Sequence, residues 1–77
     1  MNIELLVKMA NEISAFFASE SPPAQAAEDV AQHLRRFWEP RMRRQIIAHV
    51  RATGGAGLSE LARRGIEALA SAEPQPA

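Results

Sequence analysis

The 77-residue sequence contains no cysteine, and its aromatic rings are three phenylalanines and one tryptophan. Without cysteine, no disulfide can staple the fold, and no thiolate can act as a metal ligand or as a nucleophile. There is no run of about 18 apolar residues, so we expect no membrane-spanning helix. Glu4 precedes Lys8, which is the wrong order of charges for a signal peptide. These absences predict a cytoplasmic protein.

Lysine is also scarce, at one residue against eight arginines, and the formal net charge is zero. The charge is unevenly distributed. Residues 35–51 hold six arginines against a single acid, Glu39, whereas residues 1–34 hold five acids against Lys8. The acidic residues of the chain can pair with the arginines of its basic segment. This charge pattern therefore weakens the case for a polyanion as the partner.

Proline and glycine divide the chain into four segments that we expect to be helical. Ser21 is predicted to cap the second helix, with Pro22 at its first helical position. Glu39 precedes Pro40 and is therefore pushed out of the helical region, so one helix ends and another begins there. The predicted helices span approximately residues 3–18, 22–38, 40–52 and 58–70.

The expected fold class is all-α, a small bundle of three to four short helices, because no strand-like alternation and no internal repeat occurs. Asn2 can cap the first helix, and the Gly54-Gly55 pair can end the third. We expect residues 1–70 to form this one domain and residues 71–77, which offer no apolar anchor, to form a disordered tail. A chain this short is expected to be marginally stable alone.

The first predicted helix is apolar over a wider arc than the ~100° stripe of an ordinary surface helix. Its apolar residues include the neighbouring rings of Phe16 and Phe17. Two interpretations remain open. This helix is either central and covered by the other three, or it has two apolar surfaces, one for the core and one for another protein.

The later helices have narrower apolar faces. On the third, the apolar arc also contains Arg43, which must either extend its charged end to solvent or pair with a carboxylate of this chain or of a partner. The second helix gathers Ala27, Val30, Leu34, Phe37 and Trp38 on one face, and the third gathers Met42, Ile46, Ile47 and Val50.

Catalytic and metal-binding patterns are poorly supported. His33 and His49 lie on different predicted helices and fit no metal-ligand spacing. The serines occupy no nucleophile elbow. The glycine-rich stretch "TGGAGLSELARR" lacks the lysine of a phosphate-binding P-loop and follows no strand. We therefore expect no catalytic residue, no metal and no cofactor in this chain.

Three kinds of binding role remain. A helix-turn-helix module would place Arg41, Arg44 and Arg51 toward one side of the third helix, but the balanced charge and the proline turn argue against nucleic acid. A free-standing homo-oligomeric bundle is the second possibility. A steep salt dependence on DNA would reveal the first, and sedimentation of the isolated chain would reveal the second.

Protein binding, the third role, fits the segment "HLRRFWEPRMRR" best. Arginine and tryptophan are enriched at interface hot spots, and the arginine fork suits carboxylates. Trp38 and Met42 would supply apolar anchorage, and the arginines would pair with partner acids. Phe16 and Phe17 are expected as core residues or secondary contacts. The predicted partner-binding residues are Arg36, Phe37, Trp38, Arg41, Met42 and Arg43.

Over residues 2–70 the sequence resembles the delta subunit of the soluble, NAD-dependent, molybdenum-containing formate dehydrogenases of bacteria. The most specific parts of the resemblance are Met9-Ala10-Asn11, Ile13, the Phe16-Phe17 pair, Arg36-Phe37-Trp38 and Pro40-Arg41-Met42-Arg43. Glu39 stands where the family usually has aspartate, and glutamate is a weaker helix N-cap than aspartate.

The resemblance implies a non-catalytic accessory subunit without a redox centre. In such complexes, the alpha subunit carries molybdopterin guanine dinucleotide and iron–sulfur clusters. The beta subunit carries FMN and the NAD site, and the gamma subunit carries another cluster. The resemblance thus implies that this chain docks on catalytic subunits, with the alpha subunit expected first, and that it stabilises the complex or assists assembly and cofactor insertion.

Overall fold

The computed structural model describes residues 2–72 and contains four α-helices in this part of the chain. The all-α fold class is therefore confirmed. The last helix ends two residues beyond its predicted end, and the rest of the predicted tail, residues 73–77, lies outside the described residues. The helices are α1 (Ile3–Glu20), α2 (Pro23–Phe37), α3 (Pro40–Thr53) and α4 (Glu60–Ala72).

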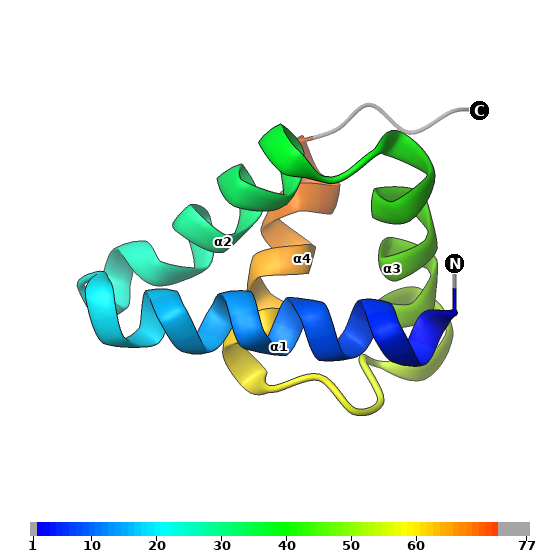
Figure 1. Cartoon of the computed structure of the whole chain (residues 1–77), viewed down its shortest axis with the longest axis horizontal. Coiled ribbons are helices and arrows are strands. Elements are labelled where there is room, and N and C mark those ends of the chain that lie inside the picture. Colours follow the sequence, from blue (N-terminus) through cyan, green and yellow to red (C-terminus); the bar gives the residue numbers. More distant parts are fainter. Residues whose placement is uncertain (1, 73–77) are drawn as a thin grey trace.

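The four helices surround one core, and α1 and α4 each pack against the other three helices. In Figure 1, α4 lies between α2 and α3, and α1 runs along one side of the bundle. The Trp38 side chain, although it follows the last residue of α2, is turned back into the core and is only 5% exposed. The buried apolar cluster consists of Leu6, Ala10, Val30, Ala31, Leu34, Trp38, Ile46, Ile47, Ala62, Ile66 and Leu69.

The residues predicted to begin α1 and to end α3 do so in the structure. The Asn2 Oδ1 accepts a hydrogen bond from the Glu4 amide at 2.7 Å, which confirms the predicted cap. Gly54 ends α3 with a φ of 76°, a left-handed conformation that glycine adopts without steric cost. Glu39 precedes α3 in extended conformation, as expected, and its side chain makes no capping hydrogen bond.

The predicted start of α2 was wrong. The helix begins at Pro23, and Pro22, not Ser21, is its N-cap residue. Ser21 instead closes α1, where its amide donates to the Phe17 carbonyl at 2.8 Å. The cause is the second proline: the residue before a proline is forced toward extended conformations, and Pro22 has a ψ of 141°.

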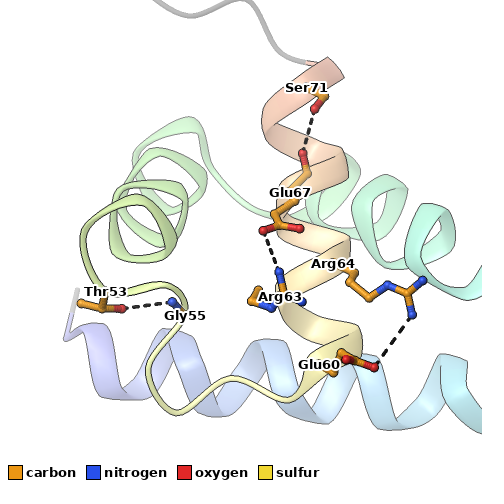
Figure 2. A network of polar contacts seen from close by, with 7 residues as sticks. All are labelled: Thr53, Gly55, Glu60, Arg63, Arg64, Glu67 and Ser71. Carbon is orange, nitrogen blue, oxygen red and sulfur yellow. Dashed lines mark hydrogen bonds and ion pairs between the residues drawn. The ribbon is translucent and has the colours of Figure 1, made fainter.

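The loop between α3 and α4 is fastened to α1 by one side chain. Asn11 donates from Nδ2 to the Gly57 carbonyl at 3.0 Å and accepts at Oδ1 from the Ser59 amide at 2.8 Å. On the α3 side, the Thr53 hydroxyl accepts from the amides of Gly55 and Ala56 (Figure 2 shows the first). This glycine-rich segment therefore has a structural use as a C-cap and connector.

Helices α2 and α4 approach each other closely at Gly65. A β-carbon at this position would lie 2.5 Å from the Cγ1 of Val30 and 2.7 Å from its Cβ. Real Cβ atoms do not tolerate such distances, so only glycine permits this helix separation. Gly65 therefore sets the position of α2, which carries much of the surface described next.

Candidate protein-binding surface

Four ring-bearing side chains cross from α1 to α2 in one continuous series, which we call the aromatic patch: Phe16, Phe17, His33 and Phe37. The Phe16 and Phe17 ring centroids are 5.2 Å apart, and Phe17 lies 5.9 Å from His33. His33 in turn lies 4.7 Å from Phe37. Such separations lie within the range of favourable ring pairs, so the patch is a packed unit.

The two ends of the aromatic patch project into solvent. Phe16 is 59% exposed and Phe37 is 68% exposed, while Phe17 and His33 are half-buried. Phe37 was predicted to share an apolar face of α2 with Val30 and Leu34, but those two residues are buried and Phe37 is not. Its neighbour Trp38 lies in the core instead. The patch therefore presents two large apolar rings to the outside.

Two hollows flank the half-buried pair Phe17 and His33, which line both of them. The hollow on the α1 side is also lined by Glu12, Ile13 and Phe16. The hollow on the α2 side is also lined by Asp29, Gln32, Arg36 and Phe37. Projecting rings beside recesses are the arrangement in which a partner's side chains become well packed and fully desolvated.

Asp29 and Arg36, the two charged residues that line the α2-side hollow, differ in the contacts that they make within the chain. The Asp29 carboxylate accepts hydrogen bonds from the Ser21 hydroxyl at 2.6 Å and from the Gln25 amide at 3.3 Å. Arg36 has its guanidinium carbon 5.9 Å from the centroid of the Phe37 ring, a cation–π distance. Within residues 2–72, Arg36 forms no ion pair.

Two further arginines, Arg41 from the predicted partner-binding set and Arg44 beside it, are exposed on the first two turns of α3. In the part of the chain that the structure describes, neither forms an ion pair. Two ion pairs lie along α4, at 2.8 Å between Arg63 and Glu67 and 4.0 Å between Arg64 and Glu60 (Figure 2). The role of Arg41 in partner binding stays a prediction.

Trp38 and Met42 lie deeper than a surface anchor would. Trp38 belongs to the buried cluster, and Met42 is half-buried and packs against it. Their contribution to a partner contact stays a prediction, and the exposed apolar surface next to them is provided by Phe37.

Arg43 makes two contacts that neither predicted alternative named. Its Nη1 donates to the backbone carbonyl of Trp38 and, at 3.4 Å, to that of Arg35. The guanidinium therefore binds the carbonyl end of α2, where a cation is electrostatically favoured. Whether Arg43 also contacts a partner stays a prediction.

The wide apolar arc of α1 combines features of both interpretations. The helix does pack against the other three, as a central helix would. Leu5 nevertheless remains 46% exposed and Phe16 59% exposed, so the covering is incomplete. A second apolar surface on α1, outside the core, therefore exists.

His33 was not predicted from the sequence as a member of the aromatic patch, since it was considered only as a metal ligand. Its spacing of four residues from Phe37 places the two rings on one helix face, and that signal could have found the pair. The contact between His33 and Phe17 could not be found in this way, because it depends on how α1 and α2 pack.

Among residues 2–72, no three histidine, aspartate or glutamate side chains gather so that they could hold a metal ion. None of the helices in this range is both long enough and apolar enough to cross a membrane.

Neither a curated protein nor a solved structure matches the chain significantly. The family model for the NADH-dependent formate dehydrogenase delta subunit, FdsD, matches residues 5–66 and so includes all four residues of the aromatic patch. The match confirms the resemblance of "NIELLVKMANEISAFF" and "FWEPRMRR" to that family. The chain therefore belongs to the delta-subunit family of the NADH-dependent formate dehydrogenases.

Proposed function

We propose that this chain is a non-catalytic accessory subunit of a cytoplasmic formate dehydrogenase complex. It docks on the catalytic subunits, with the alpha subunit as the expected partner, and it stabilises the complex or assists its assembly and cofactor insertion. The molybdopterin cofactor, iron–sulfur clusters and FMN of such a complex would all lie on other subunits. Family membership supports the association with the enzyme.

The observation that carries the docking role is the exposure of Phe16 and Phe37, together with Arg36, which lies beside Phe37 and has no ion pair within residues 2–72. Burying one large apolar side chain at an interface is worth on the order of 1.5–3 kcal/mol. A carboxylate brought to an arginine fork adds a charge-assisted hydrogen bond with defined geometry. A small chain that presents both features is suited to binding a larger protein.

An accessory role predicts that removing this chain lowers the amount or lifetime of the assembled enzyme but leaves its chemistry intact. The test compares complexes purified from cells with and without the chain. The measurements are the yield of complex, the molybdenum content, and formate-dependent NAD reduction per bound molybdenum.

We expect turnover per molybdenum to be unchanged, and yield, lifetime or molybdenum content to fall. A fall in molybdenum content would assign the role to cofactor insertion, and a fall in lifetime alone would assign it to stabilisation. A large loss of turnover at unchanged molybdenum content would refute the non-catalytic role. Equal yield, lifetime and molybdenum content in both preparations would refute the accessory role.

A further inference from the structure

The rings of the aromatic patch have nearly the same spacing when the patch is read from either end. From Phe16 the centroid separations are 5.2, 5.9 and 4.7 Å, and from Phe37 they are 4.7, 5.9 and 5.2 Å. The half-buried pair, Phe17 and His33, lies at the centre, and an exposed phenylalanine lies at each end. A second copy of the patch, turned end for end, would therefore set rings opposite rings along its whole length.

The two hollows follow the same arrangement. Phe17 and His33 line both hollows, while Phe16 lines the α1-side hollow and Phe37 lines the α2-side hollow. A two-fold rotation about the central pair turns Phe16 of a second copy toward the α2-side hollow and its Phe37 toward the α1-side hollow. Each copy then offers a projecting ring to each recess of the other, which is the self-complementarity that a two-fold interface requires.

Opposite charges lie at the two ends of this arrangement. Glu12 lines the α1-side hollow and Arg36 lines the α2-side hollow. Neither side chain forms an ion pair within residues 2–72. The same two-fold rotation turns Glu12 of each copy toward Arg36 of the other, so that two equivalent charge-assisted contacts can form.

The charge balance of the patch also favours a second copy over a strongly charged partner. Hydrogen bonds from the neutral Ser21 hydroxyl and Gln25 amide leave Asp29 with its negative charge. Besides His33, the hollows therefore carry two acids and one arginine, which match neither a strongly acidic nor a strongly basic surface. The chain has a formal net charge of zero, so two copies approach each other without net repulsion.

We propose that two copies of this chain pair through the aromatic patch, about a two-fold axis between Phe17 and His33, with Glu12 of each copy against Arg36 of the other. Two projecting rings from each copy make a small contact. We therefore expect a weak pair that forms near about 100 µM and separates near about 1 µM.

Pairing has a consequence for docking on the catalytic subunits. The rings that join two copies are the rings assigned to docking, so a paired chain must separate before it docks through them. A weak pair covers Phe16 and Phe37 in concentrated free chain and gives way to a larger partner. This consequence rests on the proposed function, whereas the pairing itself needs only the isolated chain.

Charge reversal tests the pairing and its orientation. Glu12→Arg alone and Arg36→Glu alone each set like charges against one another at both ends, so each variant should pair at least about 10-fold more weakly than wild type. The two variants mixed in equal amounts should pair with each other about as well as wild type does, because opposite charges then meet at both ends. Arg64→Glu has the same net charge as Arg36→Glu but alters α4 outside both hollows, and it should pair like wild type.

Truncation tests the rings. Phe16→Ala should weaken pairing about 10-fold, because large aromatic side chains dominate the binding energy of an interface. Leu5→Ala is the matched control, since Leu5 is exposed on the same helix but lines neither hollow. Sedimentation velocity from about 1 to 300 µM, a range that brackets the expected affinity, is the measurement, and the helicity of each variant is checked first.

Three results would each overturn the inference. The first is a wild-type chain that stays monomeric throughout the concentration range. The second is equal pairing by Phe16→Ala and Leu5→Ala. The third is a mixture of Glu12→Arg and Arg36→Glu that pairs no better than either variant alone, which would show that these two residues do not face each other across the pair.

Discussion

The Arg43 side chain donates a hydrogen bond from Nη1 to the backbone carbonyl of Trp38, the C-cap residue of α2. This bond joins the first turn of α3 to the end of α2 and places a positive charge at the carbonyl end of a helix. It also holds the backbone of a residue whose ring lies in the core. The hydrogen bond that Arg43 makes across the α2–α3 turn thus explains why an arginine lies within the apolar arc of α3.

Replacing Arg43 with alanine should destabilise the chain by about 1.5–3 kcal/mol, because a charged hydrogen bond to the helix end is lost. For a domain of this size, about 1 kcal/mol corresponds to roughly 4–8 °C in Tm. Arg44→Ala, at the exposed neighbouring position, should change Tm by little. Thermal unfolding followed by circular dichroism is the measurement, and equal Tm values for the two variants would contradict the role assigned to Arg43.

Replacing Asn11 with alanine should release the α3–α4 loop from α1. Both hydrogen bonds of its amide, to Gly57 and Ser59, are lost, at a cost of about 1–3 kcal/mol. Hydrogen exchange should accelerate at the Ser59 amide more than at amides in the middle of α2. Glu12→Ala, at the next and exposed residue, serves as the control. Unchanged exchange at Ser59 in the Asn11 variant would show that the amide does not fasten the loop.

Gly65→Ala should destabilise the bundle by about 1–3 kcal/mol through overpacking, even though alanine is the better helix former. The added methyl group would collide with Val30. Combining Gly65→Ala with Val30→Ala should therefore cost less than the sum of the two single changes, since the smaller partner makes room. Urea unfolding of all four chains gives this coupling energy, and strict additivity would rule out the predicted contact.

The isolated chain should unfold with low cooperativity or associate with itself. Leu5, Phe16 and Phe37 are each 46% exposed or more, and so short a chain has little else with which to cover them. Sedimentation across a range of concentrations, with Phe16→Ser and Phe37→Ser together as the comparison, measures this tendency. A sharply cooperative monomer that melts above about 65 °C would argue strongly for a self-sufficient fold.

The conformational preferences of individual residues were enough to predict most of the fold. Asn2, Gly54 and the Glu39-Pro40 step mark helix boundaries through conformational preferences that hold in any context. The same rule, applied to Pro22 before Pro23, would also have placed the start of α2 correctly. Serine's preference for the N-cap position favoured Ser21 instead, and the second proline overrides that preference.

The surface was harder to predict, because it depends on contacts between distant residues. Arg36, Phe37 and Arg41 were predicted as partner contacts from the composition of one segment, and the structure leaves all three exposed. The core position of Trp38 and the meeting of Phe17 with His33 depend on how α1 and α2 pack, which no local pattern encodes. The carbonyl partners of Arg43 likewise exist only once the α2–α3 turn has formed.

Side-chain footprinting of the chain, free and within the purified enzyme complex, tests docking through the aromatic patch most directly. Covalent surface labelling followed by mass spectrometry should show strong protection of Phe16, His33 and Phe37 in the complex, with labelling of Leu5 unchanged. Undiminished labelling of Phe16 and Phe37 in a complex that retains the chain would contradict docking through this surface.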